Sequence, residues 1–215
     1  MNYTKQAQHK YSLYFIVIIY IVGIIGHLIP DTREFFITLT PYSILITGGL
    51  TLFLSVRNAD KKFILWLVIT LFLTFAIEVA GAITGRIFGQ YYYGNVLGFS
   101  LLEVPVIISL NWVLIILGAA SLFAGLKLNI LYTSLLAAGA GTIYDYFLES
   151  IAIRFNYWYW DLNIVPIQNY VAWFIIIFIS TAALLKVCPK YQKGISGEYL
   201  LIQLLFFIIL SLFIS

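Results

Sequence analysis

Three carboxylates lie within long apolar stretches of the sequence: Glu78, Asp145 and Glu149. An acid near the centre of a membrane is unfavourable by at least about 2.5 kcal/mol, so such acids usually face a bundle interior and have a partner. Asp145 and Glu149 are four residues apart, which places both on one helix face, about one turn from each other. Two acids this close repel when both are ionised, so one is expected to keep its proton at neutral pH, as a general acid requires.

The same carboxylates fit two other roles. They could be structural acids paired with basic side chains, for which Arg86 and Arg154 are the obvious partners. They could also belong to a proton relay or an ion site, because such sites also place acids within membrane helices. The residue types alone leave these alternatives open beside the acid–base pair.

Two aromatic groups lie near these acids in the sequence. Tyr91 and Tyr93 follow Glu78 in a Gly- and Tyr-rich stretch, and Trp158 and Trp160 follow the second acidic region. Aromatic faces stabilise a nearby cation, which a site that protonates an alkene would need. Tyr and Trp also collect at the membrane interface in many proteins, so a structural aromatic belt explains the same residues.

The composition predicts the elements that position these residues. The 215 residues are 62% hydrophobic and 10% charged, whereas a soluble domain has roughly 25% charged residues, so lipid must be part of the solvent. We predict an all-α, polytopic membrane helix bundle with about seven transmembrane helices in a single domain, 1–215. The apolar runs are continuous, unlike barrel strands, and are long enough to span a bilayer as helices, the last being the shortest: 11–28, 35–56, 63–83, 104–126, 128–153, 165–187 and 199–214.

The stretch 84–102, between the third and fourth runs, has too many helix breakers for a helix that faces lipid. We expect either a surface loop or a re-entrant segment that folds back into the bundle. Non-helical backbone is tolerated at membrane depth only where protein surrounds it.

Basic residues are distributed unequally between the two sides of a seven-helix arrangement. Nine of the twelve Lys and Arg share the side of the N-terminus, and the other three are Arg33, Arg86 and Arg154. The positive-inside rule therefore predicts a protein of the cytoplasmic membrane with its N-terminus in the cytoplasm and its C-terminus outside. Seven of the nine acids fall on or near the outer side, so we expect chemistry in the outer half of the bundle.

No pattern in the sequence predicts a metal or a nucleotide cofactor. His9 and His27 are isolated, Cys188 is the single cysteine, and the glycines after Glu78 are not followed by the Lys-Ser/Thr of a phosphate loop. The net charge of +3 is small and is explained by membrane orientation rather than by nucleic acid.

The residues around the acids resemble the membrane carotenoid hydratases, which include the enzymes described as γ-carotene 1′,2′-hydratase and bisanhydrobacterioruberin hydratase. The resemblance covers roughly 78–173. One departure is Glu149-Ser150, where the family pattern has Asp-Pro, so the carboxylate is retained with a longer reach. The matching blocks are Glu78-x-x-Gly81-x-x-Thr84-Gly85-x-x-Phe88-Gly89-x-Tyr91-x-Tyr93-x-x-x-Leu97-Gly98, Val104-Pro105 with Trp112, Asp145 with its acid four residues later, Trp158-x-Trp160, and Pro166-x-x-Asn169-x-x-x-Trp173.

The resemblance implies a cofactor-independent hydro-lyase of carotenoid biosynthesis. It would add water to a terminal isopropylidene double bond of an acyclic or monocyclic carotenoid, a polyene dissolved in membrane lipid. Asp145 or Glu78 would protonate the alkene, and Glu149 would orient water and accept its proton. The residues expected to bind substrate, shield the cation, position water or tune the acids are Tyr91, Tyr93, Trp112, Trp158, Trp160, Asn169 and Arg86.

Three other functions compete with hydration. A lycopene-type cyclase would use the same protonation, but a neighbouring alkene would capture the cation. A small proton-coupled carrier would also need acids within helices, yet the acids here crowd to one side and no inverted repeat is evident. A purely structural scaffold would not explain why Glu78, Asp145 and Glu149 lie within membrane helices.

Overall fold

The computed structural model describes residues 3–214, and most of these residues are helical. Eight α-helices, four short strands and one 3-10 helix occur in this described part of the chain. The helices are α1 (Tyr3–Leu28), α2 (Pro30–Thr38), α3 (Thr40–Val56), α4 (Lys61–Thr84), α5 (Ile107–Phe123), α6 (Ile130–Arg154), α7 (Ile167–Val187) and α8 (Ser196–Phe213). The other elements are β1 (Tyr91–Tyr93), β2 (Ser100–Leu101), β3 (Val104–Pro105), β4 (Trp158–Trp160) and the 3-10 helix η1 (Asp161–Asn163).

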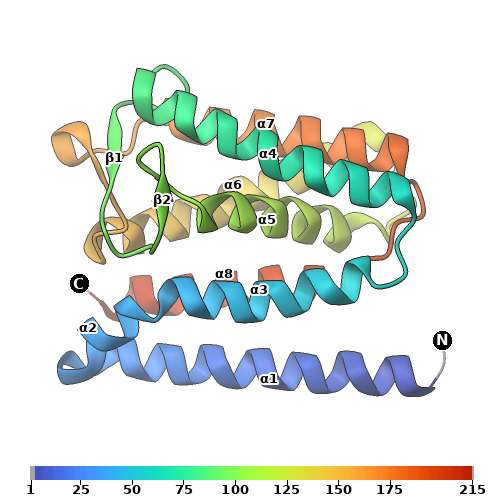
Figure 1. The fold of residues 1–215 in the computed structure, drawn as a ribbon, viewed down its shortest axis with the longest axis horizontal. Coiled ribbons are helices and arrows are strands. Elements are labelled where there is room, and N and C mark those ends of the chain that lie inside the picture. The colour runs from blue at the N-terminus through green and yellow to red at the C-terminus, as the bar shows by residue number, and fades with distance from the viewer. Residues whose placement is uncertain (1–2, 215) are drawn as a thin grey trace.

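The long helices run side by side and form one bundle (Figure 1). Helix α5 lies in the middle, because every residue from Asn111 to Ser121 is buried. The surrounding helices expose apolar side chains, such as Phe72 of α4 and Ile179 of α7, which are 67% and 58% exposed. An apolar exterior around a fully apolar central helix is the pattern of a bundle immersed in lipid. The prediction of an all-α polytopic membrane protein agrees with this architecture.

The helix count is less simple than the seven predicted runs. Four helices of the described chain, α1, α4, α7 and α8, are long and apolar enough to cross a membrane, and α2 with α3 makes a fifth span if the bent pair counts as one. The run predicted over 35–56 is divided by a bend of 57° between α2 and α3. Pro41, in the first turn of α3, has no N–H to continue the preceding helix, which explains the break. Seven spans therefore stay a prediction.

The Gly- and Tyr-rich segment after α4 packs against one end of the bundle (Figure 1). Helix α4 ends at Thr84, and the next residue, Gly85, has a φ of 63°, the left-handed conformation that glycine adopts without strain. Phe88, Tyr91 and Leu97 of this segment are buried. Strand β1 pairs with β4, which lies more than sixty residues later in the chain, and β2 pairs with β3 in a small hairpin.

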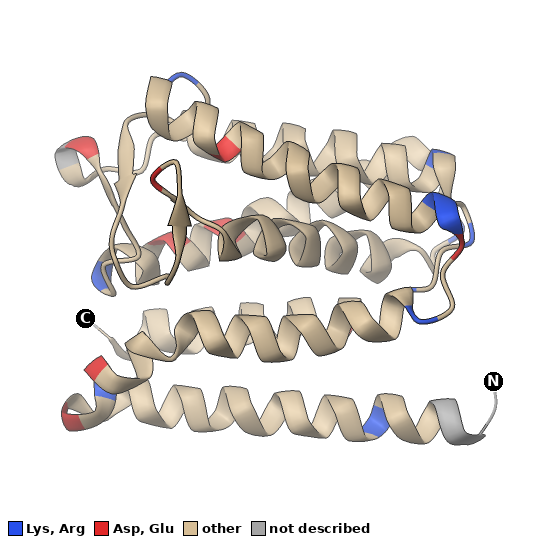
Figure 2. Ribbon diagram, in the orientation of Figure 1, with Lys and Arg blue, Asp and Glu red and all other residues tan. Residues whose placement is uncertain are grey.

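The charged residues separate along the bundle axis. Figure 2 shows most Lys and Arg residues at the end that contains the α3–α4 connection, and most Asp and Glu residues toward the opposite end. Lys10 and the lysines that begin α4 belong to the first group, whereas the side chain of Lys5 lies outside the described residues. The separation matches the charge asymmetry predicted from the sequence, and which end faces the cytoplasm stays a prediction.

Helices α6 and α7 approach each other closely because Gly141 has no side chain. A Cβ atom at Gly141 would lie 2.2 Å from Cδ1 of Ile177. Asp145 and Glu149 follow Gly141 at intervals of one turn on the same face of α6. The close approach therefore brings the start of α7, with Asn169, next to both acids.

Candidate active site

A two-stranded ribbon, β1 with β4, carries four aromatic side chains toward the bundle. Tyr91 lies opposite Trp160, and Tyr93 lies opposite Trp158. Because alternate residues of a strand share a face, these four side chains point to one side of the ribbon. Tyr92 and Tyr159, the pair between them, stack on the other face with ring centroids 5.1 Å apart.

Glu78 of α4 accepts hydrogen bonds from the two tyrosines of this ribbon and from Trp112 of α5. Its Oε2 accepts from the hydroxyls of Tyr91 at 2.6 Å and Tyr93 at 2.7 Å. Its Oε1 accepts from Nε1 of Trp112 at 2.6 Å, and the Trp112 ring stacks on Trp173 at 3.9 Å. Glu78 is buried. Three neutral donors therefore stabilise this carboxylate, and no basic side chain pairs with it among the residues that the structure describes.

The two tyrosines of this group act as hydrogen-bond donors. Burial, together with the nearby charge of Glu78, raises the pKa of Tyr93 well above its ordinary value. The same two causes raise the pKa of Tyr91. Both hydroxyls therefore keep their protons at neutral pH and direct them at Glu78.

Glu149 and Asp145 of α6 form the second acidic group. Oε2 of Glu149 accepts from the indoles of Trp160 at 2.7 Å and Trp158 at 3.0 Å. One amide nitrogen, Nδ2 of Asn169, donates to Asp145 at 2.7 Å and to Oε1 of Glu149 at 3.3 Å. Both acids are buried. Two carboxylates that share one donor, with no cationic side chain beside them in the described part of the chain, favour a state with one proton between them.

The predicted pairing of the acids with arginines is corrected by the structure. Arg86 and Arg154 are both exposed, at the ends of α4 and α6. In the described part of the chain, Tyr, Trp and Asn side chains donate to the three acids. Arg86 contributes through its backbone, because its carbonyl accepts a hydrogen bond from the amide of Gln168 and so fastens the segment after α4 to α7.

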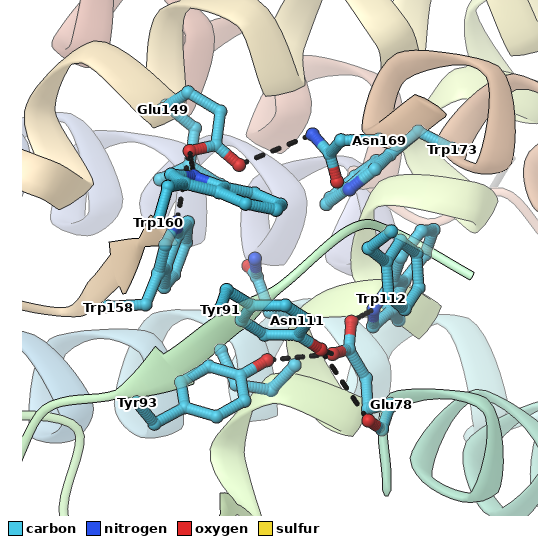
Figure 3. Close-up of a pocket in the computed structure, with 13 residues that line it drawn as sticks. Glu78, Tyr91, Tyr93, Asn111, Trp112, Glu149, Trp158, Trp160, Asn169 and Trp173 are labelled. Carbon is cyan, nitrogen blue, oxygen red and sulfur yellow. Dashed lines mark hydrogen bonds between the residues drawn. The ribbon is translucent and has the colours of Figure 1, made fainter. Parts of the chain in front are cut away.

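A pocket of about 30 Å³ lies between the two acidic groups. Figure 3 shows Glu78 and Glu149 on opposite sides of it. On this measure of volume, a water molecule needs about 10–15 Å³, so the pocket has room for water. Eight of the ten residues predicted to form a site line it: Glu78, Tyr91, Tyr93, Trp112, Glu149, Trp158, Trp160 and Asn169.

The other two predicted residues lie elsewhere. Arg86 is at the surface, as described above. Asp145 is fully buried behind the pocket wall and reaches the pocket only through its shared partner Asn169 and its neighbour Glu149. Asp145 is therefore not placed to touch a substrate directly.

Five lining residues were missing from the sequence prediction: Phe88, Ile108, Asn111, Leu148 and Trp173. Asn111 of α5 lines the pocket, is buried, and has an Oδ1 atom without a hydrogen-bond partner in the described structure. A lone asparagine inside the apolar run 104–126 was a signal that could have identified it. Trp173 also lines the pocket, and it was part of the matching sequence blocks without being assigned to the site.

A second, larger cavity adjoins the acidic pocket. It has a volume of about 260 Å³, and we call it the chamber. Asn111, Leu148, Trp158 and Ile108 line both the pocket and the chamber. The arrangement as a whole is a small polar pocket with two facing acids at the end of an apolar space.

The lipid-facing surface borders this chamber. Ile18 of α1 lines the chamber and is 60% exposed. Ile44 of α3 also lines the chamber. A ligand dissolved in lipid could therefore pass between α1 and α3 into the chamber.

The comparisons with known proteins agree with the membrane architecture. The sequence model of a family described as carotenoid biosynthesis protein matches residues 39–215, which include every residue of the pocket. No curated protein and no solved structure matches the chain.

Proposed function

This chain belongs to the carotenoid biosynthesis protein family, and from that premise we propose that it is a cofactor-independent hydratase. It adds water to a terminal isopropylidene double bond of a carotenoid, which makes it a hydro-lyase of carotenoid biosynthesis. The observation that carries the proposal is the pair of buried carboxylates, Glu78 and Glu149, that face each other across a pocket next to an apolar, lipid-bordered chamber.

The chamber suits the substrate. A carotenoid is an apolar polyene that dissolves in the bilayer, so it reaches the protein sideways through lipid. Its terminal unit passes along the chamber and meets the pocket where Leu148, Trp158 and Ile108 line both spaces. This route delivers the double bond at the end of the chain, and not one in its middle, to the acids.

The proton comes from the Asp145–Glu149 pair. Glu149 lines the pocket and Asp145 does not, so Glu149 is the member that transfers the proton. The alkene π electrons form the new C–H bond at the less substituted carbon, and the dimethyl carbon becomes a tertiary cation. Asp145 acts as a positioning residue, because its negative charge beside Glu149 keeps the shared proton in place until the alkene arrives.

The pocket wall stabilises the cation. The rings of Tyr91 and Trp160 lie 5.1 Å apart, and Trp112 stacks on Trp173. The π faces of such rings attract a cation. Glu78 adds a full negative charge that is already solvated by its three donors, so the protein need not reorganise when the positive charge develops.

Water then captures the cation. We assign the water to the space between Glu78 and Asn111, whose unpaired Oδ1 accepts one of its hydrogens. The water oxygen forms the C–O bond with the dimethyl carbon, and its proton passes to the Glu78 carboxylate. Return of that proton to Glu149 through pocket water restores the starting state, and the product is a tertiary alcohol.

We further assign the pocket to the outer half of the bilayer, with the N-terminus of the chain in the cytoplasm. The support is the separation of basic from acidic residues along the bundle. The bundle lies in the cytoplasmic membrane under this proposal.

Pigment analysis tests the function. The full chain is expressed in a host that accumulates an acyclic or monocyclic carotenoid, and the pigments are analysed by mass spectrometry. We expect a product heavier by one water, and growth in water enriched in the heavy oxygen isotope should label its hydroxyl. A new pigment of unchanged mass with a ring would select the cyclase, and unaltered pigments with normal protein levels would reject both enzymes.

A further inference from the structure

The chamber has a polar wall that hydration chemistry does not use. Most of its lining is apolar, but His27 of α1 and Gln203 of α8 also line it. Their side chains are 4% and 2% exposed. His27 Nε2 and Gln203 Oε1 have no hydrogen-bond partner in the described structure. A buried polar atom without a partner is unusual in a folded protein, and in a cavity it calls for a hydrogen-bonding partner from water or from a ligand.

The hydrogen bonds around Gln203 fix which end of its amide is free. Tyr20 donates to the hydroxyl of Tyr199 at 3.4 Å, and Thr47 lies 3.3 Å from that hydroxyl. Thr47 itself donates to a backbone carbonyl, so its oxygen is free to accept the single proton of Tyr199. Tyr199 then accepts from Nε2 of Gln203, which lies 3.1 Å away. This arrangement leaves the Oε1 atom of Gln203 as a free acceptor.

The ring of His27 is oriented in the same way. Its Nδ1 lies 2.7 Å from the carbonyl oxygen of Gly23, which can only accept, so Nδ1 carries the proton. With one proton on the ring, Nε2 presents a lone pair. Phe155 stacks on the ring at 5.0 Å and Phe206 meets it edge-on at 5.6 Å, and these contacts hold it in this orientation.

Both unpaired atoms are thus acceptors, and this selects the chemistry of the ligand. A pure hydrocarbon would leave them unpaired, and an ether or a carbonyl would place a further acceptor beside them. A hydroxyl group supplies the missing donor. We propose that the chamber binds a lipid-soluble alcohol, an apolar chain with a hydroxyl that donates to Gln203 Oε1 or His27 Nε2.

The identity of this alcohol as the enzyme's own product rests on the proposed function, whereas the binding of an alcohol does not. Hydration converts an alkene end into a tertiary alcohol next to the chamber. As the product moves from the pocket toward lipid, its new hydroxyl passes from Asn111, where the two cavities meet, to the acceptors on α1 and α8. The chamber would then favour release of the hydrated end over its return to the acids.

Binding to the purified full-length protein in lipid nanodiscs tests the proposal. The probes are an acyclic terpenoid with a tertiary hydroxyl at its dimethyl end, its methyl ether and the parent alkene. We expect the alcohol to bind about tenfold more tightly than the ether or the alkene, because only the alcohol pairs a buried acceptor. Gln203→Leu or His27→Phe should reduce this preference to about twofold or less, and loss in one variant identifies the acceptor.

Glu78→Gln provides the matched control. This change should abolish hydration under the proposed function and leave the preference for the alcohol intact, since Glu78 lines only the acidic pocket. Equal binding of alcohol, ether and alkene to the native protein overturns the inference, and so does a preference that survives in the Gln203→Leu, His27→Phe double variant. Alcohol binding without any hydration of carotenoids would reject the proposed function alone.

Discussion

The two acidic groups of the pocket share one ribbon but differ in what surrounds each carboxylate. Glu78 stands alone, with two tyrosines from β1 and Trp112 as donors. Glu149 receives two tryptophans from β4, and its remaining oxygen shares Asn169 with Asp145. The strands align these donors directly opposite one another. The same scaffold therefore serves one isolated acid and one coupled pair.

This difference teaches how two similar glutamates can have opposite roles. Three donors around a single acid stabilise its anion, which suits a group that attracts a cation and accepts a proton. Where a second acid lies one turn away, repulsion between the two negative charges opposes the ionisation of both acids. This suits a group that holds and delivers a proton. Under the proposed function, the environment of each glutamate and not its residue type makes one the acid and the other the base.

Removal of the proton donor should have the largest effect. Glu149→Gln keeps the size of the side chain but has no proton to give, so hydration in pigment extracts should fall by about a thousandfold. Glu149→Asp is the matched control, because it keeps a carboxylate and should retain measurable product. Full activity of Glu149→Gln at normal protein levels would reverse the roles given to the two acidic groups.

Loss of the isolated acid should be the next largest effect. Glu78→Gln removes the charge that faces the cation and the base for water, so we expect a loss of about a hundredfold. The measurement is the initial rate of product formation in membranes, normalised to protein. If Glu78→Gln lost no more activity than a neutral substitution of an exposed residue does, the role of Glu78 as the base would be contradicted.

Asp145→Asn should weaken the coupled pair and change its pH dependence. Without a charged neighbour, Glu149 loses its proton at lower pH, and only the protonated form can act. Activity should therefore fall by about tenfold at neutral pH and approach the native level as the pH is lowered. A rate profile measured against pH tests the sign, and an equal loss at every pH would show that Asp145 does not act through proton retention.

The arginines should have the smallest effect. Arg86→Gln and Arg154→Gln each remove an exposed charge that donates to none of the three acids, so activity should stay within about twofold of the native level, as expected for exposed charges. The activity of the Glu78→Gln variant, measured in the same kind of membranes, shows how large a loss the removal of an acidic group causes. If an arginine variant lost as much activity as Glu78→Gln does, that arginine would have to be a partner of the acids after all.

Several parts of the site could be predicted from the sequence because their physical signals are local. Glu78, Asp145 and Glu149 were identified by charge within apolar runs, and the four-residue spacing placed two of them on one helix face. Trp158 and Trp160 could be selected as an aromatic group but not paired with Tyr91 and Tyr93. That pairing joins segments more than sixty residues apart, and no local periodicity encodes it.

Other features depended on distances that a sequence does not contain. Arg86 and Arg154 were natural partners by charge, yet the ends of α4 and α6 carry them to the surface. Asn111 was the one asparagine in the apolar run 104–126, and only the bundle shows that it lies where the pocket meets the chamber. The bend at the start of α3 likewise follows from Pro41, but one proline could equally have stood in a loop.

By itself, the sequence determined that lipid surrounds this chain and that its helices cross the membrane. It also determined that most acids lie toward one end of the bundle. These follow from composition and from local spacing, which act over one or two turns. Only the tertiary structure decided which acids face the pocket, that neutral donors replace the arginines, and that an apolar chamber with free acceptors on His27 and Gln203 adjoins the pocket. The physical reason is that burial and hydrogen bonding depend on segments distant in the chain, which meet only when the bundle packs around α5.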